Sequence, residues 1–246
     1  MIATTMENIR SSAINVSDIE KKYMGRTVLQ GVSLALQQGE FGIITGASGS
    51  GKSTLLRICC GIENPDKGAV SLLGQGFSEL GGRQKRKFIR EHAGITLQDP
   101  RLDRSMSLIE NVLLPAAAKG RKIDYSYLER AIRLFGLADN MYDDVSKMSG
   151  GEQMRVSILR AMIPGNDLLF ADEPTNHLDS HNKELVFGLF KLATQEFGTT
   201  ALVVTHDAEY ARPFSDIEFC MADGTLTDTK RYVTASSRES IKPLNP

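Results

Sequence analysis

The sequence predicts an α/β fold with a mainly parallel central sheet, and three observations support this prediction. Short apolar runs of strand length alternate with helical stretches, as in chains that layer helices around a sheet. Residues 41–45, 167–172 and 201–206 are almost wholly apolar, as buried parallel strands are. Each of these runs ends in polar residues, which the C-terminal ends of parallel strands deliver to a crevice at one edge of a sheet.

The composition narrows the class of protein. Of the 246 residues, 41% are hydrophobic and 24% are charged, which excludes a mainly disordered chain. The formal net charge of −1 gives no reason to expect direct binding of nucleic acid. No apolar run approaches the roughly 20 residues that cross a bilayer, and residues 1–12 lack the pattern of a secretory signal. The odd number of cysteines (Cys59, Cys60 and Cys220) argues against a disulfide framework, so we expect a reducing cytoplasm.

The first third of the chain has its own pattern. Residues 27–36 alternate apolar and polar side chains, with Val28, Val32, Leu34 and Leu36 as the apolar set. This alternation predicts a half-exposed antiparallel strand, and with it an antiparallel β subdomain. Residues 81–90 carry five basic side chains and a single aromatic ring, Phe88. We therefore expect a solvated helix face there rather than a nucleic-acid surface.

A helical block interrupts the strand pattern between Gln98 and Pro164. Residues 125–135 have apolar side chains at helical spacing, and residues 151–162 read as a second helix that Pro164 ends. We expect a helical subdomain at about residues 99–163, inserted in a single domain that spans residues 13–228. Residues 229–246 are predicted to form a polar C-terminal extension.

A phosphate-binding loop is the most specific local signal. The loop fits the pattern G-x-x-x-x-G-K-[ST] between a strand-like run and a helix that opens at Thr54. Glycines let the backbone wrap around phosphates, and the helix N-terminus faces the anion. The lysine is expected to reach the β- and γ-phosphates of ATP, and the serine hydroxyl to ligate Mg²⁺. The residues of the pattern are Gly46, Ala47, Ser48, Gly49, Ser50, Gly51, Lys52 and Ser53.

An acidic pair ends the second apolar run. Asp172 stands where a carboxylate can hold Mg²⁺, and Glu173, one residue further, can orient or deprotonate the water that attacks the γ-phosphate. Pro174 stops the strand directly after them. These features together predict a P-loop nucleoside triphosphatase core.

A second anion-binding helix start precedes the acidic strand. Ser149, Gly150 and Gly151 open the helix of residues 151–162 and can present backbone N–H groups to an anion. This segment is either a second phosphate site or the part of the chain that completes the nucleotide site of a second copy. Alone, it would be an ordinary N-cap followed by a glycine-rich turn.

These motifs in this order resemble the nucleotide-binding subunits of ABC transporters, from about Ala13 to Asp228. The family signature L-S-G-G-Q corresponds to residues 148–152, with Met148 and Glu152 as its departures. Further matches link single residues to named family elements. Gln98 matches the Q-loop, Asp179 the D-loop, His206 the switch histidine and Tyr23 the adenine-stacking aromatic. Within the family, the chain is most similar to the lipoprotein-release, macrolide-efflux and cell-division group.

The resemblance implies a role for each of these residues. Tyr23 stacks on adenine, and Gln98 senses Mg²⁺ and the attacking water while it links the site to a membrane partner. His206 contacts the γ-phosphate and positions Glu173, and Asp179 communicates across a dimer. Ser149, Gly150 and Gly151 bind the γ-phosphate of the ATP held by the opposite subunit.

The implied protein is an ATPase that powers an ABC-type membrane transporter. It works as a homodimer, or as a pseudo-dimer with a second ATPase subunit, on an integral membrane subunit at the cytoplasmic face of the membrane. Two alternatives stay open at this point. One is a soluble ABC ATPase that acts on a ribosome or a cell-envelope partner. The other is a small-molecule kinase, which would leave the signature segment unexplained.

Overall fold

The central sheet has six strands in the order β10-β9-β3-β8-β7-β6. The computed structural model describes residues 12–163 and 165–232. Five strands are parallel, and β10 pairs antiparallel with β9 at one edge. The predicted mainly parallel α/β sheet is therefore confirmed. The strands are β3 (Phe41–Gly46), β6 (Ala93–Thr96), β7 (Leu168–Asp172), β8 (Thr200–Val204), β9 (Ile217–Ala222) and β10 (Thr225–Arg231).

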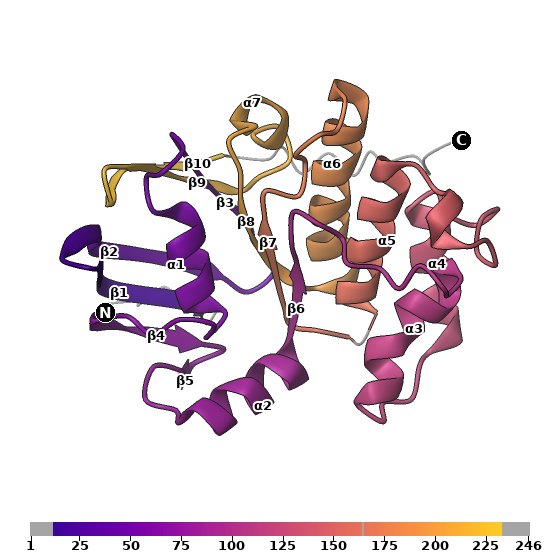
Figure 1. Cartoon of the computed structure of the whole chain (residues 1–246), viewed down its shortest axis with the longest axis horizontal. Coiled ribbons are helices and arrows are strands. Elements are labelled where there is room, and N and C mark those ends of the chain that lie inside the picture. The colour runs from indigo at the N-terminus through magenta and orange to yellow at the C-terminus, as the bar shows by residue number, and fades with distance from the viewer. Residues whose placement is uncertain (1–11, 164, 233–246) are drawn as a thin grey trace, which may run out of the picture.

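The predicted antiparallel subdomain is the second sheet, of order β2-β1-β4-β5 (Figure 1). The alternating run lies on β2, where Val32, Leu34 and Leu36 are buried. They pack in one core with α1 (Lys52–Cys59) and with one face of the central sheet. The strands are β1 (Ser12–Tyr23), β2 (Arg26–Gln37), β4 (Lys67–Leu72) and β5 (Gln75–Gly76).

The other face of the central sheet is covered by helices. Both predicted helices are present, as α4 (Tyr125–Leu134) and α5 (Gly150–Met162), although Pro164 lies outside the described residues. The remaining helical elements are α2 (Gly82–His92), α3 (Leu108–Ala118), η1 (Val145–Lys147), α6 (Ser180–Phe197) and α7 (Ala208–Ala211).

The helical block shares a core with the sheet. Its apolar residues pack together with alternate residues of β3, β7 and β8, such as Ile43, Ala171 and Val203. Neighbours of these residues along the strands face the other core. None of the helices within residues 12–163 and 165–232 has the length and apolar character that a bilayer crossing requires.

The C-terminal boundary differs from the expected one. The boundary predicted after residue 228 falls inside β10, and Tyr232 still donates a backbone hydrogen bond to Asp216 O at 2.9 Å. Most of β10 is exposed and polar, so its sequence lacks the apolar alternation that marks a strand. Residues 233–246 of the predicted extension lie outside the described residues.

A buried carboxylate ties β9 to its surroundings. Glu218 is fully buried and accepts hydrogen bonds from Thr45 Oγ1 at 2.8 Å, from Arg212 Nε at 2.9 Å, and from the Tyr232 hydroxyl. Burial pushes the pKa of Glu218 upward, but these hydrogen bonds outweigh it and lower the pKa to about 2.

The Glu218 network should make stability depend on pH in acid. Because the folded pKa lies below the ordinary value of 4.5, the stabilisation is present above pH 4.5 and is lost as pH falls toward 2. The loss amounts to about 3 kcal/mol. Urea unfolding of the wild type and of Glu218→Gln across this range measures it. The difference in free energy of unfolding between the two proteins should shrink as pH falls. A constant difference would contradict the role given to Glu218.

The core under α6 should tolerate truncation poorly. Phe190 is fully buried, and its ring stacks on Phe41 with centroids 5.8 Å apart. We expect Phe190→Ala to lower the free energy of unfolding by about 3–5 kcal/mol, because the cavity cannot close fully. Urea unfolding gives the value, and Tyr142→Ala, at an 82% exposed ring, is the control with little expected change.

Candidate active site

The candidate site is a pocket of about 710 Å³ at the C-terminal edge of the central sheet. This volume lies within the range of small-molecule sites. The pocket brings together the phosphate loop, the first residue after β7 and the second residue after β8. Its lining residues are Val28, Ser48, Gly49, Gly51, Lys52, Ser53, Thr54, Glu173, Asn176 and His206.

The phosphate loop can form only with glycine at two of its positions. Gly46 has φ of 147°, and a Cβ there would lie 2.1 Å from Met221 O on β9. At Gly51, with φ of 99°, a Cβ would lie 2.9 Å from Val28 O on β2. The β9–β10 turn supports the loop from outside, because Gly224 N donates to Ser50 O at 3.2 Å.

The polar groups of the loop suit an anion. Lys52 is buried, and its Nζ donates to Gly46 O at 2.9 Å and to Ala47 O at 3.0 Å, but it makes no ion pair among the described residues. The hydroxyl of Ser50 is buried and has no hydrogen-bond partner within residues 12–163 and 165–232. An unpaired cation, an unsatisfied hydroxyl and the N-terminus of α1 therefore converge, which fits the predicted phosphate cradle.

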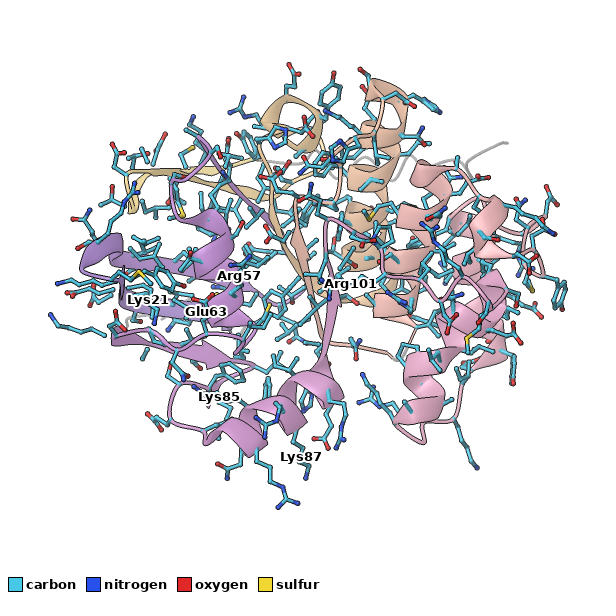
Figure 2. The ribbon with its side chains drawn as sticks, viewed as in Figure 1. Lys21, Arg57, Glu63, Lys85, Lys87 and Arg101 are labelled. Atoms are coloured by element: carbon cyan, nitrogen blue, oxygen red, sulfur yellow. The ribbon has the colours of Figure 1, made fainter. Side chains whose placement is uncertain are left out.

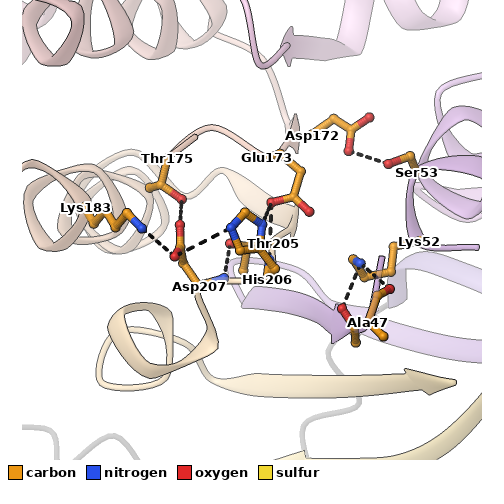
Figure 3. A network of polar contacts seen from close by, with 11 residues as sticks. Ala47, Lys52, Ser53, Asp172, Glu173, Thr175, Lys183, Thr205, His206 and Asp207 are labelled. Atoms are coloured by element: carbon orange, nitrogen blue, oxygen red, sulfur yellow. Dashed lines mark hydrogen bonds and ion pairs between the residues drawn. The ribbon is translucent and has the colours of Figure 1, made fainter. Parts of the chain in front are cut away.

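Ser53 and Asp172 meet as the sequence predicts. The Ser53 hydroxyl donates to Asp172 Oδ1 at 2.8 Å across the gap between α1 and β7 (Figure 3). A hydroxyl beside a carboxylate is a donor set that suits Mg²⁺. The described residues contain no cluster of three or more His, Cys, Asp or Glu side chains that could hold a metal alone. A cation at Ser53 and Asp172 would therefore need further oxygens from a phosphate or from water.

Glu173 and His206 form the second predicted contact. His206 Nδ1 lies 2.7 Å from Glu173 Oε2, and the His206 backbone N–H donates to the same oxygen at 3.2 Å (Figure 3). The contact arises because β7 and β8 are adjacent and parallel, so both residues leave the sheet at the same edge. Glu173 has φ of 49°, a left-handed conformation that is uncommon for residues other than glycine.

Asp207 fixes the loops that carry this contact. Its carboxylate is buried and accepts hydrogen bonds from Thr175 Oγ1 at 2.7 Å and from Lys183 Nζ at 2.6 Å (Figure 3). The loop after β8 is thereby tied to the loop after β7 and to α6. The role of Asp207 was not predicted from the sequence, and neither was the place of Val28 and Asn176 in the pocket lining. Only the position of Asp207 next to His206 could have pointed to it.

Two further predicted residues lie outside the pocket lining. Gln98 follows β6 by two residues, at the same edge of the sheet as Asp172. Tyr23 ends β1, is 41% exposed, and its hydroxyl hydrogen bonds to Glu63.

The signature residues also lie outside the pocket lining, at the start of α5. The Ser149 hydroxyl donates to Glu152 Oε2 at 2.7 Å and accepts from the Glu152 N–H at 3.3 Å, which is a capping box. Ser149 and Gly150 are exposed, and Gly151 is buried.

The predicted D-loop residue adjoins this turn. Asp179 caps α6 and accepts hydrogen bonds from the backbone and side-chain nitrogens of Asn182, at 2.9 and 2.8 Å. A Cβ on Gly151 would lie 2.4 Å from Asn182 Oδ1. The starts of α5 and α6 therefore pack side by side, away from the pocket that holds Lys52.

The family model described as ABC transporter matches residues 29–176. The chain is 33% identical over 233 residues to the lipoprotein-releasing system ATP-binding protein LolD of Leptospira interrogans, covering 94% of this chain and 97% of that protein. It is 36% identical over 223 residues to the macrolide export ATP-binding/permease protein MacB of Chlorobium phaeobacteroides. That match covers 89% of this chain and 34% of the MacB protein.

Solved structures give the same result. The dimeric structure of MJ0796, a bacterial ABC transporter cassette, aligns with a TM-score of 0.76 and 32% identity. The alignment covers 89% of this chain and 98% of the MJ0796 chain. The same cassette in a dimeric post-hydrolysis state bound to ADP and Pi aligns with a TM-score of 0.75 and 31% identity.

Proposed function

Because this chain belongs to the ABC transporter family, we propose that its own pocket binds and hydrolyses ATP to power a membrane transporter. It is an ATP-binding, ATP-hydrolysing subunit of the type found in lipoprotein-releasing and macrolide-export systems. The observation that supports this proposal is that Glu173 and His206 contact each other and line the same pocket as Lys52 and Ser53.

The phosphate loop supplies the binding half of the site. Lys52 leaves the carbonyls of Gly46 and Ala47 to reach the β- and γ-phosphates, and backbone N–H groups of the loop and of α1 surround them. Ser53 and Asp172 would hold Mg²⁺, with Gln98 at the same edge of the sheet. Bound Mg²⁺ neutralises charge on the phosphate oxygens.

Glu173 and His206 supply the chemical half. The Glu173 carboxylate accepts the proton of the attacking water or orients that water toward the γ-phosphate. His206 holds the carboxylate in place through two contacts and is itself exposed toward the pocket, where it can touch the γ-phosphate. Positioning and charge stabilisation account for most of the catalysis in phosphoryl transfer.

The signature segment serves a second copy. Ser149 and Gly150 are exposed and lie outside the pocket of their own chain. The Ser149 N–H donates to Glu152 Oε2 at 2.8 Å, so the N–H of Gly150 and the Ser149 hydroxyl face an ATP bound elsewhere. The dimeric cassette structures similar to this chain support an arrangement in which two copies close on two ATP molecules. Asp179, packed through Asn182 against Gly151, connects the two sites, and Tyr23 stacks on adenine.

The membrane side of the proposal rests on the relatives. The chain aligns with about a third of the length of the MacB relative, whose name joins an ATP-binding part to a permease. We infer that an integral membrane subunit supplies the corresponding permease here, and that the chain sits at the cytoplasmic face of the membrane through that subunit. ATP closes the dimer, hydrolysis opens it, and the partner follows this change.

Replacing Glu173 should separate binding from hydrolysis. We expect Glu173→Gln to bind ATP as the wild type does and to lose roughly 100-fold or more of its turnover, because the base is gone. ATP-bound dimers should accumulate and be visible by size-exclusion chromatography with light scattering. Glu209→Gln removes the same charge from exposed α7 outside the pocket and should change neither quantity. Normal turnover in Glu173→Gln would assign the base elsewhere.

Blocking the signature turn should abolish hydrolysis without affecting ATP binding by the monomer. We expect this of Ser149→Arg, because the arginine side chain obstructs the γ-phosphate of the opposite site. Ser107→Arg is a matched control, since Ser107 and Glu110 form the same capping box at the start of α3. Both variants lose a cap worth about 1 kcal/mol, and only Ser149→Arg should lose phosphate release. Equal phosphate release from both would rule out the shared site.

A further inference from the structure

The outer face of α2 is strongly basic and stays outside the ATP chemistry. Arg83, Arg86, Lys87 and Arg90 are exposed on this helix, and we call them the basic face. The helix lies at the edge of the molecule opposite α7 and the start of α6 (Figure 1). Binding at the basic face would therefore leave the nucleotide pocket open.

The cations of the basic face are mostly unmatched. Within the described residues, Arg83, Arg86 and Arg90 make no hydrogen bond or ion pair, and Lys87 approaches Glu91 only at 3.9 Å. Lys85 behaves differently, because it is buried and donates to Asn64 Oδ1 at 2.8 Å. Figure 2 shows Lys85 on the side of α2 toward the body of the molecule and Lys87 on the side away from it. The fold thus uses Lys85 in a contact with the body of the molecule and leaves the basic face exposed to solvent.

A hollow extends this surface onto a distant segment. It has a volume of about 400 Å³ and is lined by Arg90 and Glu91 of α2, by Ala118 at the end of α3, and by Lys119 and Arg121 after it. Burial, together with the charges of Arg121 and Arg90, lowers the pKa of Lys119 to about 8, while the charge of Glu91 opposes the shift. Three cations around one acid leave the hollow positive, so it suits a phosphate group.

The face lacks the features of a protein interface. Phe88 of α2 is buried and Ile89 is partly buried against the core, so neither provides an exposed apolar anchor. The centres of protein interfaces are depleted of charge and enriched in aromatic residues, which is the reverse of this face. A diffuse layer of negative charge fits four exposed cations on one helix better than a shaped partner does.

We propose that the basic face and the adjoining hollow bind the anionic headgroups of a phospholipid membrane. The choice of lipid over other polyanions rests on the proposed membrane role of the chain. The lipid phosphate would enter the hollow between Arg90 and Lys119, while Arg83, Arg86 and Lys87 lie over neighbouring headgroups. Such contact would hold α2 against the bilayer and fix the orientation of the ATPase beneath its partner.

Vesicle sedimentation of the full chain tests this proposal. The probes are vesicles of phosphatidylcholine alone and of phosphatidylcholine mixed with phosphatidylglycerol, at low and raised salt. We expect binding to the anionic vesicles only, weakened by salt. The triple variant Arg83→Gln/Arg86→Gln/Lys87→Gln should bind about 100-fold more weakly, at roughly five-fold per charge. The control Lys67→Gln/Arg133→Gln/Lys230→Gln removes three exposed charges elsewhere and should bind within a few-fold of the wild type.

Three results would overturn the proposal. They are equal binding of the wild type to both vesicle types, equal weakening by the two triple variants, and tighter binding of the basic face to a DNA duplex than to anionic vesicles at matched phosphate concentration. ATP hydrolysis is measured on the same proteins without vesicles. Loss of hydrolysis in all of them would count against the proposed function, and vesicle binding would still be judged on its own.

Discussion

The parallel pairing of β7 with β8, and of β8 with β3, is the constraint on which the site depends. Ile44 pairs with Val204, and Val204 pairs with Asp172, so β7 and β8 end at one level, two residues before the end of β3. The phosphate loop begins at the end of β3, the acidic pair lies at the end of β7, and His206 is the second residue after β8. Hydrogen bonds of the backbone thus bring together residues that are more than a hundred positions apart in the chain, and the side chains then need only short contacts to complete the site.

Rigid supports hold those contacts in place. Asp207 ties the loop after β8 to Thr175 and Lys183, and the carbonyls of Gly46 and Ala47 hold Lys52. Ser149 is held in the same manner by Glu152 at the start of α5. The polar groups proposed to act on a nucleotide are therefore already positioned by the protein's own hydrogen bonds.

Sequence patterns predicted the sheet and the pocket well because strong local signals encode them. Buried parallel strands are nearly all apolar, and the phosphate loop needs glycine where φ is positive, so both are visible in the residues. The strand β10 is polar and exposed, and Val28 and Asp207 take part in the site only through contacts across the fold. Such features depend on tertiary neighbours, and no local pattern reports them.

The turn between β9 and β10 has a consequence for biosynthesis. Met221 and Gly224 close the outer side of the phosphate loop, although the loop itself lies in the first quarter of the sequence. During translation the emerging polypeptide carries the glycine motif long before these two residues leave the ribosome. We therefore expect the phosphate loop of the nascent chain to reach its final form only when the last strands of the sheet join the others.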